Sequence, residues 1–166
     1  MEIFIREIEE KDYLTLLPIW DNELGNGSVT AENITPHYDR VKNDDRYKTY
    51  VAVLEDEVVG FISSAQTYAV GFDGACMQII AMAVKTENQN KGIGTKLIQR
   101  MEAYAREQGC YSIGVCSGVK RTGAHAFYEH NGYDKGSYAF AKWLTPIWHD
   151  TGTAVNGDMG RTQRES

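Results

Sequence analysis

Residues 77–95 read MQIIAMAVKTENQNKGIGT, and they contain the transition that decides the fold. Residues 77–84 are almost continuously apolar, as in a buried strand, and an amphipathic segment runs from Gly92 to Gly109. The first turn of a helix offers unpaired N–H donors and the positive end of the helix dipole. Glycines at 92 and 94 have no side chain that would hold a phosphate away. The stretch therefore predicts a strand, a pyrophosphate-binding loop and a helix.

The glycine spacing excludes two common phosphate-binding loops. A Walker loop needs four residues between its first glycine and Gly-Lys-Ser/Thr, whereas Gly92 is followed directly by Ile93-Gly94-Thr95. A dinucleotide fingerprint needs a third glycine three residues after the second, and that position is Leu97. A different phosphate ligand is indicated.

A second motif, RTGAHAFYEHNGY, occupies residues 121–133. Ala124, Phe127 and Tyr128 have the i, i+3, i+4 spacing that places side chains on one helix face. Gly132 is expected to end this helix.

The two motifs, in this order and separation, resemble the signatures of the GNAT acetyltransferase superfamily. The tract from Ser117 to Glu129 is similar to that of small-molecule N-acetyltransferases, with Arg121 at a position where many members have asparagine. The resemblance implies an α/β (α+β) fold, with a mixed, mostly antiparallel sheet of six to seven strands and about four helices on both faces.

The resemblance also implies a reaction, in which acetyl-CoA acetylates a primary amine of a small molecule by direct attack in a ternary complex. It implies Tyr128 as the general acid, against the simpler interpretation of a core tyrosine. Arg121 could instead be a solvated residue of the first helical turn. The implied contacts to CoA are Met82, Ala83, Val84, Gln89, Asn90, Lys91, Gly92, Ile93, Gly94, Thr95, Ser117, Arg121, Ala124, Phe127 and Tyr128.

The general base and the acceptor stay open. Many relatives have a glutamate on the central strand, but the matching stretch offers only Gln78. Glu23, Asp21 and Asp73 are candidates, although ordinary surface carboxylates are the more economical interpretation. His125 is better explained as a packing or loop-bonded histidine. A CoA-binding sensor without turnover, or a protein or peptide acetyltransferase, are the alternatives to a small-molecule enzyme.

Along the chain, alternation and turn residues predict one domain over residues 1–148 and a polar, flexible tail over 149–166. Asp12 is expected to cap a helix that Pro18 ends or kinks. The other expected elements are strands at 2–8, 50–54, 58–64, 77–84 and 111–116, helices at 36–42, 92–108 and 121–131, and one or two closing strands at 133–144.

Composition sets the remaining limits. The chain has 166 residues, 42% of them hydrophobic, and a net charge of −6, which argues against nucleic acid as a partner. No apolar run is long enough to cross a membrane, and no secretory signal is visible. Three cysteines without C-x-x-C spacing indicate reduced thiols and a cytoplasmic protein, with no metal expected and a homodimer possible.

Overall fold

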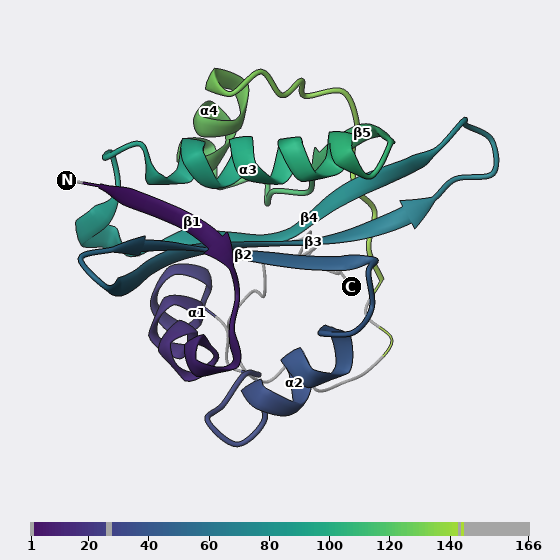
Figure 1. Cartoon of the computed structure of the whole chain (residues 1–166). Coiled ribbons are helices and arrows are strands. Elements are labelled where there is room, and N and C mark those ends of the chain that lie inside the picture. The colour runs from purple at the N-terminus through teal and green to yellow at the C-terminus, as the bar shows by residue number, and fades with distance from the viewer. Residues whose placement is uncertain (1, 26–27, 143, 145–166) are drawn as a thin grey trace, which may run out of the picture.

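A computed structural model of the chain describes residues 2–25, 28–142 and 144 (Figure 1). Its strands are β1 (Ile3–Glu7), β2 (Tyr47–Leu54), β3 (Glu57–Tyr68), β4 (Ala75–Val84) and β5 (Cys110–Val115). Its helices are α1 (Leu17–Leu24), α2 (Ile34–Val41), α3 (Ile93–Glu107) and α4 (Thr122–His130), with 3-10 turns η1 (Glu10–Asp12), η2 (Leu14–Leu16) and η3 (Thr86–Asn88).

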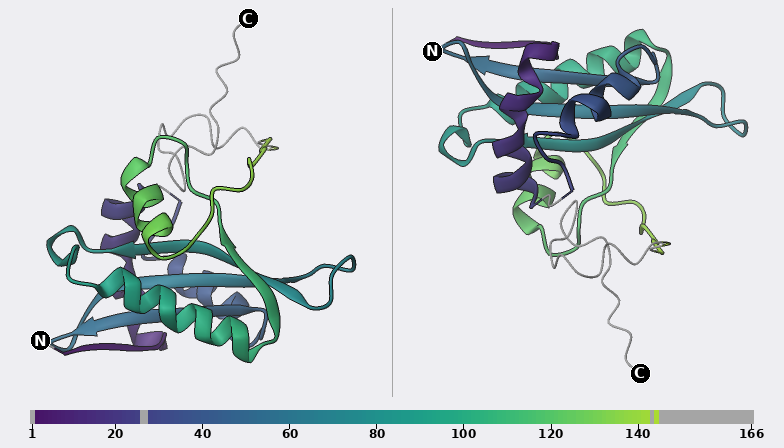
Figure 2. Two further views of the ribbon diagram at one scale, coloured as in Figure 1. Left: turned by 90° about the horizontal axis from the view of Figure 1, so that it is seen from above. Right: turned by 90° about the horizontal axis from the view of Figure 1, so that it is seen from below.

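The strands form one sheet in the order β1-β2-β3-β4-β5. All neighbours are antiparallel except β4 and β5, which are parallel and are joined through α3. Helices α1 and α2 cover one face of the sheet, and α3 and α4 lie over the other (Figures 1 and 2). The mixed, mostly antiparallel sheet with helices on both faces is thus confirmed.

Two apolar clusters hold the layers together. Ile93, Leu97, Ile98, Met101 and Ala105 of α3 are all buried in the cluster above the sheet, as the sequence predicts. A second cluster joins α1 and α2 to the opposite face of the sheet. Helix α3 ends where Gly109 adopts φ 70°, the left-handed conformation that glycine favours.

An extra residue in β4 changes which face its side chains occupy. Ser63 pairs with Ala81 and Ser64 pairs with Ile79, so Ile80 has no partner in β3 and forms a bulge. Ile79, before the bulge, and Met82, after it, both pack in the apolar cluster that contains α3. In a strand without a bulge these two side chains would lie on opposite faces of the sheet. No sequence signal in the apolar run predicts this bulge.

Three local predictions are wrong. Asp12 caps no helix, because it is the last residue of η1 and Glu9 occupies the N-cap position. Pro18 lies at the start of α1 and does not end a helix, because the first turn of a helix needs no N–H from that residue. No strand forms over the described part of 133–144. The described sheet has five strands where six to seven were expected, a small difference that leaves the predicted fold class intact. Tyr138 and Phe140 are 89% and 95% exposed, so ordering this segment as a strand would gain little burial. The predicted tail at 149–166 lies outside the described residues.

The connection from β1 to α1 depends on a buried charge. Arg6 donates to both carboxylate oxygens of Asp12, at 2.6 and 2.9 Å, and the Glu9 N–H donates to the same carboxylate at 2.8 Å. Burial opposes the negative charge of Asp12, but the hydrogen bonds from Arg6 and Glu9 outweigh it and lower the pKa of Asp12 below its ordinary value.

Asp12→Asn is expected to reduce the free energy of unfolding by about 2–3 kcal/mol, because Arg6 then loses its counter-charge. Because the folded pKa is depressed, this stabilisation is present above the unfolded pKa of about 3.9 and is lost as the pH falls through the folded value. Urea unfolding at pH 7 and at pH 3 measures both effects. Equal losses at the two pH values would contradict this role of the carboxylate.

Candidate active site

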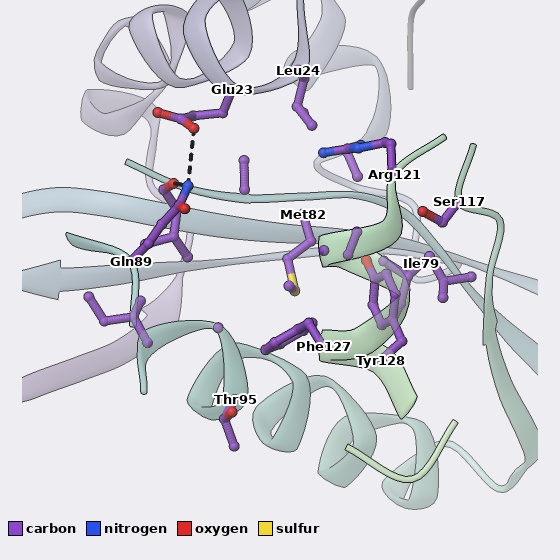
Figure 3. Close-up of a pocket in the computed structure, with 18 of the residues that line it drawn as sticks. Glu23, Leu24, Ile79, Met82, Gln89, Thr95, Ser117, Arg121, Phe127 and Tyr128 are labelled. Atoms are coloured by element: carbon purple, nitrogen blue, oxygen red, sulfur yellow. Dashed lines mark hydrogen bonds between the residues drawn. The ribbon is translucent and has the colours of Figure 1, made fainter. Parts of the chain in front are cut away.

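A cleft of about 670 Å³ opens where β5 separates from β4 (Figure 3). The two strands pair only as far as Ile79 and Val115, whereas β4 continues to Val84. Residues 79–84 therefore line the cleft together with the end of α1, most of residues 88–95, residues 115–117 and α4. The divergence of two parallel strands thus creates a cleft beside unpaired backbone.

The register of β4 shows which of its backbone groups face the cleft. The Lys85 N–H donates to the Val59 carbonyl on β3, at 2.9 Å. In an antiparallel ladder alternate residues face the partner strand, so Ala83 also faces β3, and Met82 and Val84 face away from it. The Val84 carbonyl accepts a hydrogen bond from Gln89 Nε2 at 3.0 Å, on that open side. The N–H groups of Met82 and Val84 are therefore directed towards the cleft.

The loop before α3 concentrates hydrogen-bond donors. Within the described residues no N–H from Asn90 to Thr95 donates a hydrogen bond, and the first that does is Lys96, to Gly92. Asn90 and Gly92 adopt φ 61° and φ 77°, and such left-handed residues turn successive N–H groups into a concave anion site. The partial positive charge at the start of α3 adds to this preference for an anion.

Gly94 permits close packing between α3 and α4. A Cβ at this position would lie 3.1 Å from the ring of Phe127 and 3.7 Å from Met82 Cε. The two motifs found in the sequence are therefore in direct contact, and α4 forms the wall of the cleft opposite β4.

Glu23 on α1 is committed to hydrogen bonds with the loop. Its carboxylate accepts from the Thr86 N–H at 2.8 Å, from Thr86 Oγ1 at 3.0 Å and from Gln89 Nε2 at 3.2 Å. Gln89 in turn holds the end of β4, so α1, β4 and the loop are joined through one carboxylate (Figure 3). Glu23 therefore serves to position the loop. Both of its carboxylate oxygens already accept hydrogen bonds, so it is poorly placed to act as a general base.

Two substitutions separate these roles of Glu23. On the CoA-binding role that the resemblance implies, Glu23→Ala is expected to weaken CoA binding about five-fold, because the hydrogen bonds that order the loop contribute about 1 kcal/mol. Glu23→Gln keeps an acceptor oxygen and is expected to retain both affinity and turnover within a few-fold. Calorimetry and steady-state rates measure the two effects.

The control for both variants is Glu57→Ala, which removes an exposed carboxylate paired with Lys85 outside the cleft. A hundred-fold loss of turnover in Glu23→Gln, with unchanged CoA affinity, would instead identify Glu23 as the base.

Tyr128 lines the cleft from the middle of α4 and stands beside Phe127 and Tyr133 in an aromatic cluster. Burial raises the pKa of Tyr128 above its ordinary value, and the positive charge of Arg121 acts in the opposite direction. A raised pKa keeps the hydroxyl protonated at neutral pH. The group is therefore available as a proton donor.

The segment between β5 and α4 is fixed by a histidine. His125 Nε2 lies 2.8 Å from the Gly118 carbonyl, which confirms the interpretation of His125 as a loop-bonded residue. The fixed segment presents Ser117 and Arg121 to the cleft. The hydroxyl of Ser117 is buried without a hydrogen-bond partner, and Arg121 forms no ion pair with any described residue.

The structure brings together nearly all of the site residues expected from the sequence. Those that line the cleft are Met82, Ala83, Val84, Gln89, Asn90, Gly92, Ile93, Gly94, Thr95, Ser117, Arg121, Ala124, Phe127 and Tyr128. Lys91 is exposed and does not line it, and neither do Asp21 and Asp73. Lining residues that the motifs did not indicate include Leu24 and Ile80, which the order of the sheet and its bulge place there.

Within the range of residues that could be described, no helix is long and apolar enough to cross a membrane. The same residues contain no cluster of three or more metal-ligating side chains.

Residues 5–133 match the model of the acetyltransferase (GNAT) family. The chain is 29% identical over 94 residues to an aminoalkylphosphonate N-acetyltransferase of Salmonella typhimurium, which covers 57% of this chain and 61% of that protein. The chain spans between about two fifths and three fifths of the length of the curated relatives it matches.

Solved structures share the fold. An aminoglycoside acetyltransferase from an uncultured soil metagenomic sample, in complex with trehalose, superposes with a TM-score of 0.74 at 22% identity, covering 86% of this chain and 97% of that one. AAC(6')-Iy in complex with the bisubstrate analog CoA-S-monomethyl-acetylneamine gives a TM-score of 0.76 at 13% identity, covering 87% and 99%.

Proposed function

Because the chain belongs to the acetyltransferase (GNAT) family, we propose that it transfers the acetyl group of acetyl-CoA to a primary amine of a small molecule, by direct attack in a ternary complex. The observation that carries the proposal is the run of unpaired N–H groups from Asn90 to Thr95, at the mouth of a cleft whose floor is unpaired strand. A diphosphate fits such a set of donors.

The chain's own residues can be given roles along this cleft. The N–H groups of residues 90–95 hold the diphosphate, and residues 82–84 hold the pantetheine arm, with Ala124 and Phe127 closing the opposite side. Acetyl-CoA supplies an acetyl group that is activated as a thioester. The open N–H groups of β4 stabilise negative charge on the acetyl oxygen, because preorganised donors need no rearrangement during the reaction.

Tyr128 is proposed to donate the proton that the departing sulfur requires. An ordinary tyrosine has a pKa of about 10 and a thiol about 8.5, so donation is uphill by about 2 kcal/mol. Burial increases this cost and Arg121 decreases it. The cost is small compared with the barrier that an enzyme must lower.

The amine must reach the thioester without its extra proton. Among the described residues that line the cleft the one carboxylate is Glu23, and it is occupied by Thr86 and Gln89. We propose that the proton leaves through water. The rate should then rise with pH as the ammonium form of the acceptor loses its proton and becomes the neutral amine. The lack of an available carboxylate also favours the second candidate function, a CoA-binding module without turnover.

One experiment separates the two candidates. The protein is mixed with acetyl-CoA and a panel of amines (diamines, amino sugars, aminoalkyl acids and peptides with free amino termini), and thiol release is followed alongside CoA binding by calorimetry. Amine-dependent thiol release supports the enzyme. CoA binding with no release on any amine would leave the binding module.

A further inference from the structure

The described lining of the cleft contains an unusual balance of charge. Its charged side chains are Glu23, which already accepts hydrogen bonds from Thr86 and Gln89, and Arg121, which has no ion pair among the described residues. The other titratable side chains of the described lining are Cys116, Tyr128 and His130. The Glu23 carboxylate keeps its charge but is held by the loop, so Arg121 is the one charged side chain at the other end of the described lining. That end of the cleft favours an anion.

Arg121 lies across the cleft from the loop proposed to hold the diphosphate (Figure 3). The diphosphate loop is tied to the Val84 end of β4 through Gln89, whereas Ser117 follows Val115, which pairs with Ile79. Val84 lies five strand residues beyond the Ile79–Val115 pair, about 16 Å at the usual rise of 3.3 Å per residue, and Ser117 follows Val115 by two residues in the same direction. Figure 3 likewise shows Arg121 and Ser117 on the opposite side of the cleft from Gln89 and Thr95.

The thioester end of the cleft is where the acceptor amine must enter. Under the proposed function the pantetheine arm runs from the loop along β4 towards Ile79, and this arm and the thioester carry no negative charge. Arg121, projecting from the start of α4 towards Leu24 on α1, thus has no anion on the acetyl donor to bind (Figure 3). The partly buried guanidinium and the buried, unpartnered hydroxyl of Ser117 lie where the acceptor has to bind.

We propose that Arg121, assisted by Ser117, binds an acidic group on the acceptor, so that the substrate class is a small primary amine carrying a phosphate, phosphonate or carboxylate. This inference rests on the proposed function and specifies its acceptor. A guanidinium binds such oxyanions with two parallel hydrogen bonds, and the Ser117 hydroxyl supplies a third donor. The apolar side chains of Leu24 and Ile80 beside it suit the short alkyl chain that joins the acid to the amine.

The test compares acceptors that share an aminoethyl unit and differ in the group attached to it: 2-aminoethyl phosphate, 3-aminopropanoate, ethanolamine and 1,2-diaminoethane. The expected kcat/KM is at least 30-fold higher for the two acids than for ethanolamine, and lowest for the diamine. Arg121→Gln is expected to lower kcat/KM for the acids at least 30-fold more than for ethanolamine, whose own loss reflects only the effect of Arg121 on the pKa of Tyr128. Ser117→Ala should give a smaller loss, confined to the acids.

Controls distinguish acceptor binding from other roles of Arg121. Arg106→Gln removes the same charge from the exposed face of α3 outside this cleft. This variant should leave the ratio of kcat/KM between the acids and ethanolamine unchanged. The CoA affinity of Arg121→Gln is measured alongside, so that any loss of cofactor binding is separated from loss of the acceptor. If Arg121 acts only by lowering the pKa of Tyr128, the loss in Arg121→Gln will be equal for all four amines, which would overturn the inference.

Calorimetry of 2-aminoethyl phosphate with the CoA-loaded protein separates this inference from the proposed function. Binding that Arg121→Gln abolishes, without acetyl transfer to any amine, would support the anion site and contradict the enzyme. Efficient transfer to ethanolamine or the diamine, indifferent to Arg121→Gln, would support the enzyme and overturn the anion site.

Discussion

Gly92→Val is expected to weaken CoA binding at least about 30-fold, the largest loss of affinity for any single change in the loop. Gly92 has φ 77°, a conformation that is strongly unfavourable for a β-branched residue. No hydrogen bond from residues 90–95 holds the loop in place, so the loop is expected to relax and turn its N–H groups away from the cleft. Loss of one charge-assisted hydrogen bond, about 2 kcal/mol, corresponds to this factor.

The chain contains a matched control for this strain. Gly109, at the other end of α3, has φ 70°, and a Cβ at either glycine would meet nothing within 4 Å. Gly109→Val should therefore cost a comparable amount of stability, about 1–2 kcal/mol for a left-handed residue, and leave CoA affinity unchanged. Calorimetry with CoA and urea unfolding compare the two variants. Equal CoA affinity in both would remove the loop from the binding site.

Tyr128→Phe is expected to lower turnover by a factor of about 10² to 10⁴, the range that positioned proton donors contribute, with less than three-fold change in the Kd of CoA. The ring still fills the wall of the cleft, and the variant removes only the hydroxyl. Steady-state rates with a saturating amine, together with calorimetry, measure the two quantities.

Tyr133→Phe provides the comparison, because this ring packs on Tyr128 and its buried hydroxyl makes no hydrogen bond of normal geometry, although burial and the nearby Glu102 both raise its pKa. Removing an unsatisfied hydroxyl is expected to leave turnover unchanged and stability equal or slightly higher. If Tyr128→Phe were as active as Tyr133→Phe, the leaving sulfur would have to receive its proton elsewhere.

The sequence was informative where local chemistry determines the structure. The succession of strand, loop and helix over residues 77–95, the buried face of α3 and its end before Gly109 all follow from side-chain type and spacing, and the structure confirms them. The contact between Gly94 and Phe127 was not predicted, because the residues are 33 positions apart and nothing local relates them.

The rest depended on contacts between distant segments. Glu23 could be singled out as a carboxylate, but its three hydrogen bonds to Thr86 and Gln89 require α1 to lie beside the end of β4. The bulge at Ile80 lies within an apolar run that reads equally well as a regular strand. The predicted strands at 133–144 were wrong because apolar alternation in the sequence does not guarantee a neighbouring strand to pair with.

The most direct test of the account is the ¹H–¹⁵N correlation spectrum of the full chain, recorded without and with saturating acetyl-CoA. Because N–H groups that bind a diphosphate change their shifts strongly, the largest changes are expected at residues 90–95, followed by Met82 and Val84. Largest changes elsewhere, with the amides of 90–95 unmoved, would show that this loop does not hold the cofactor and would contradict the proposed reaction.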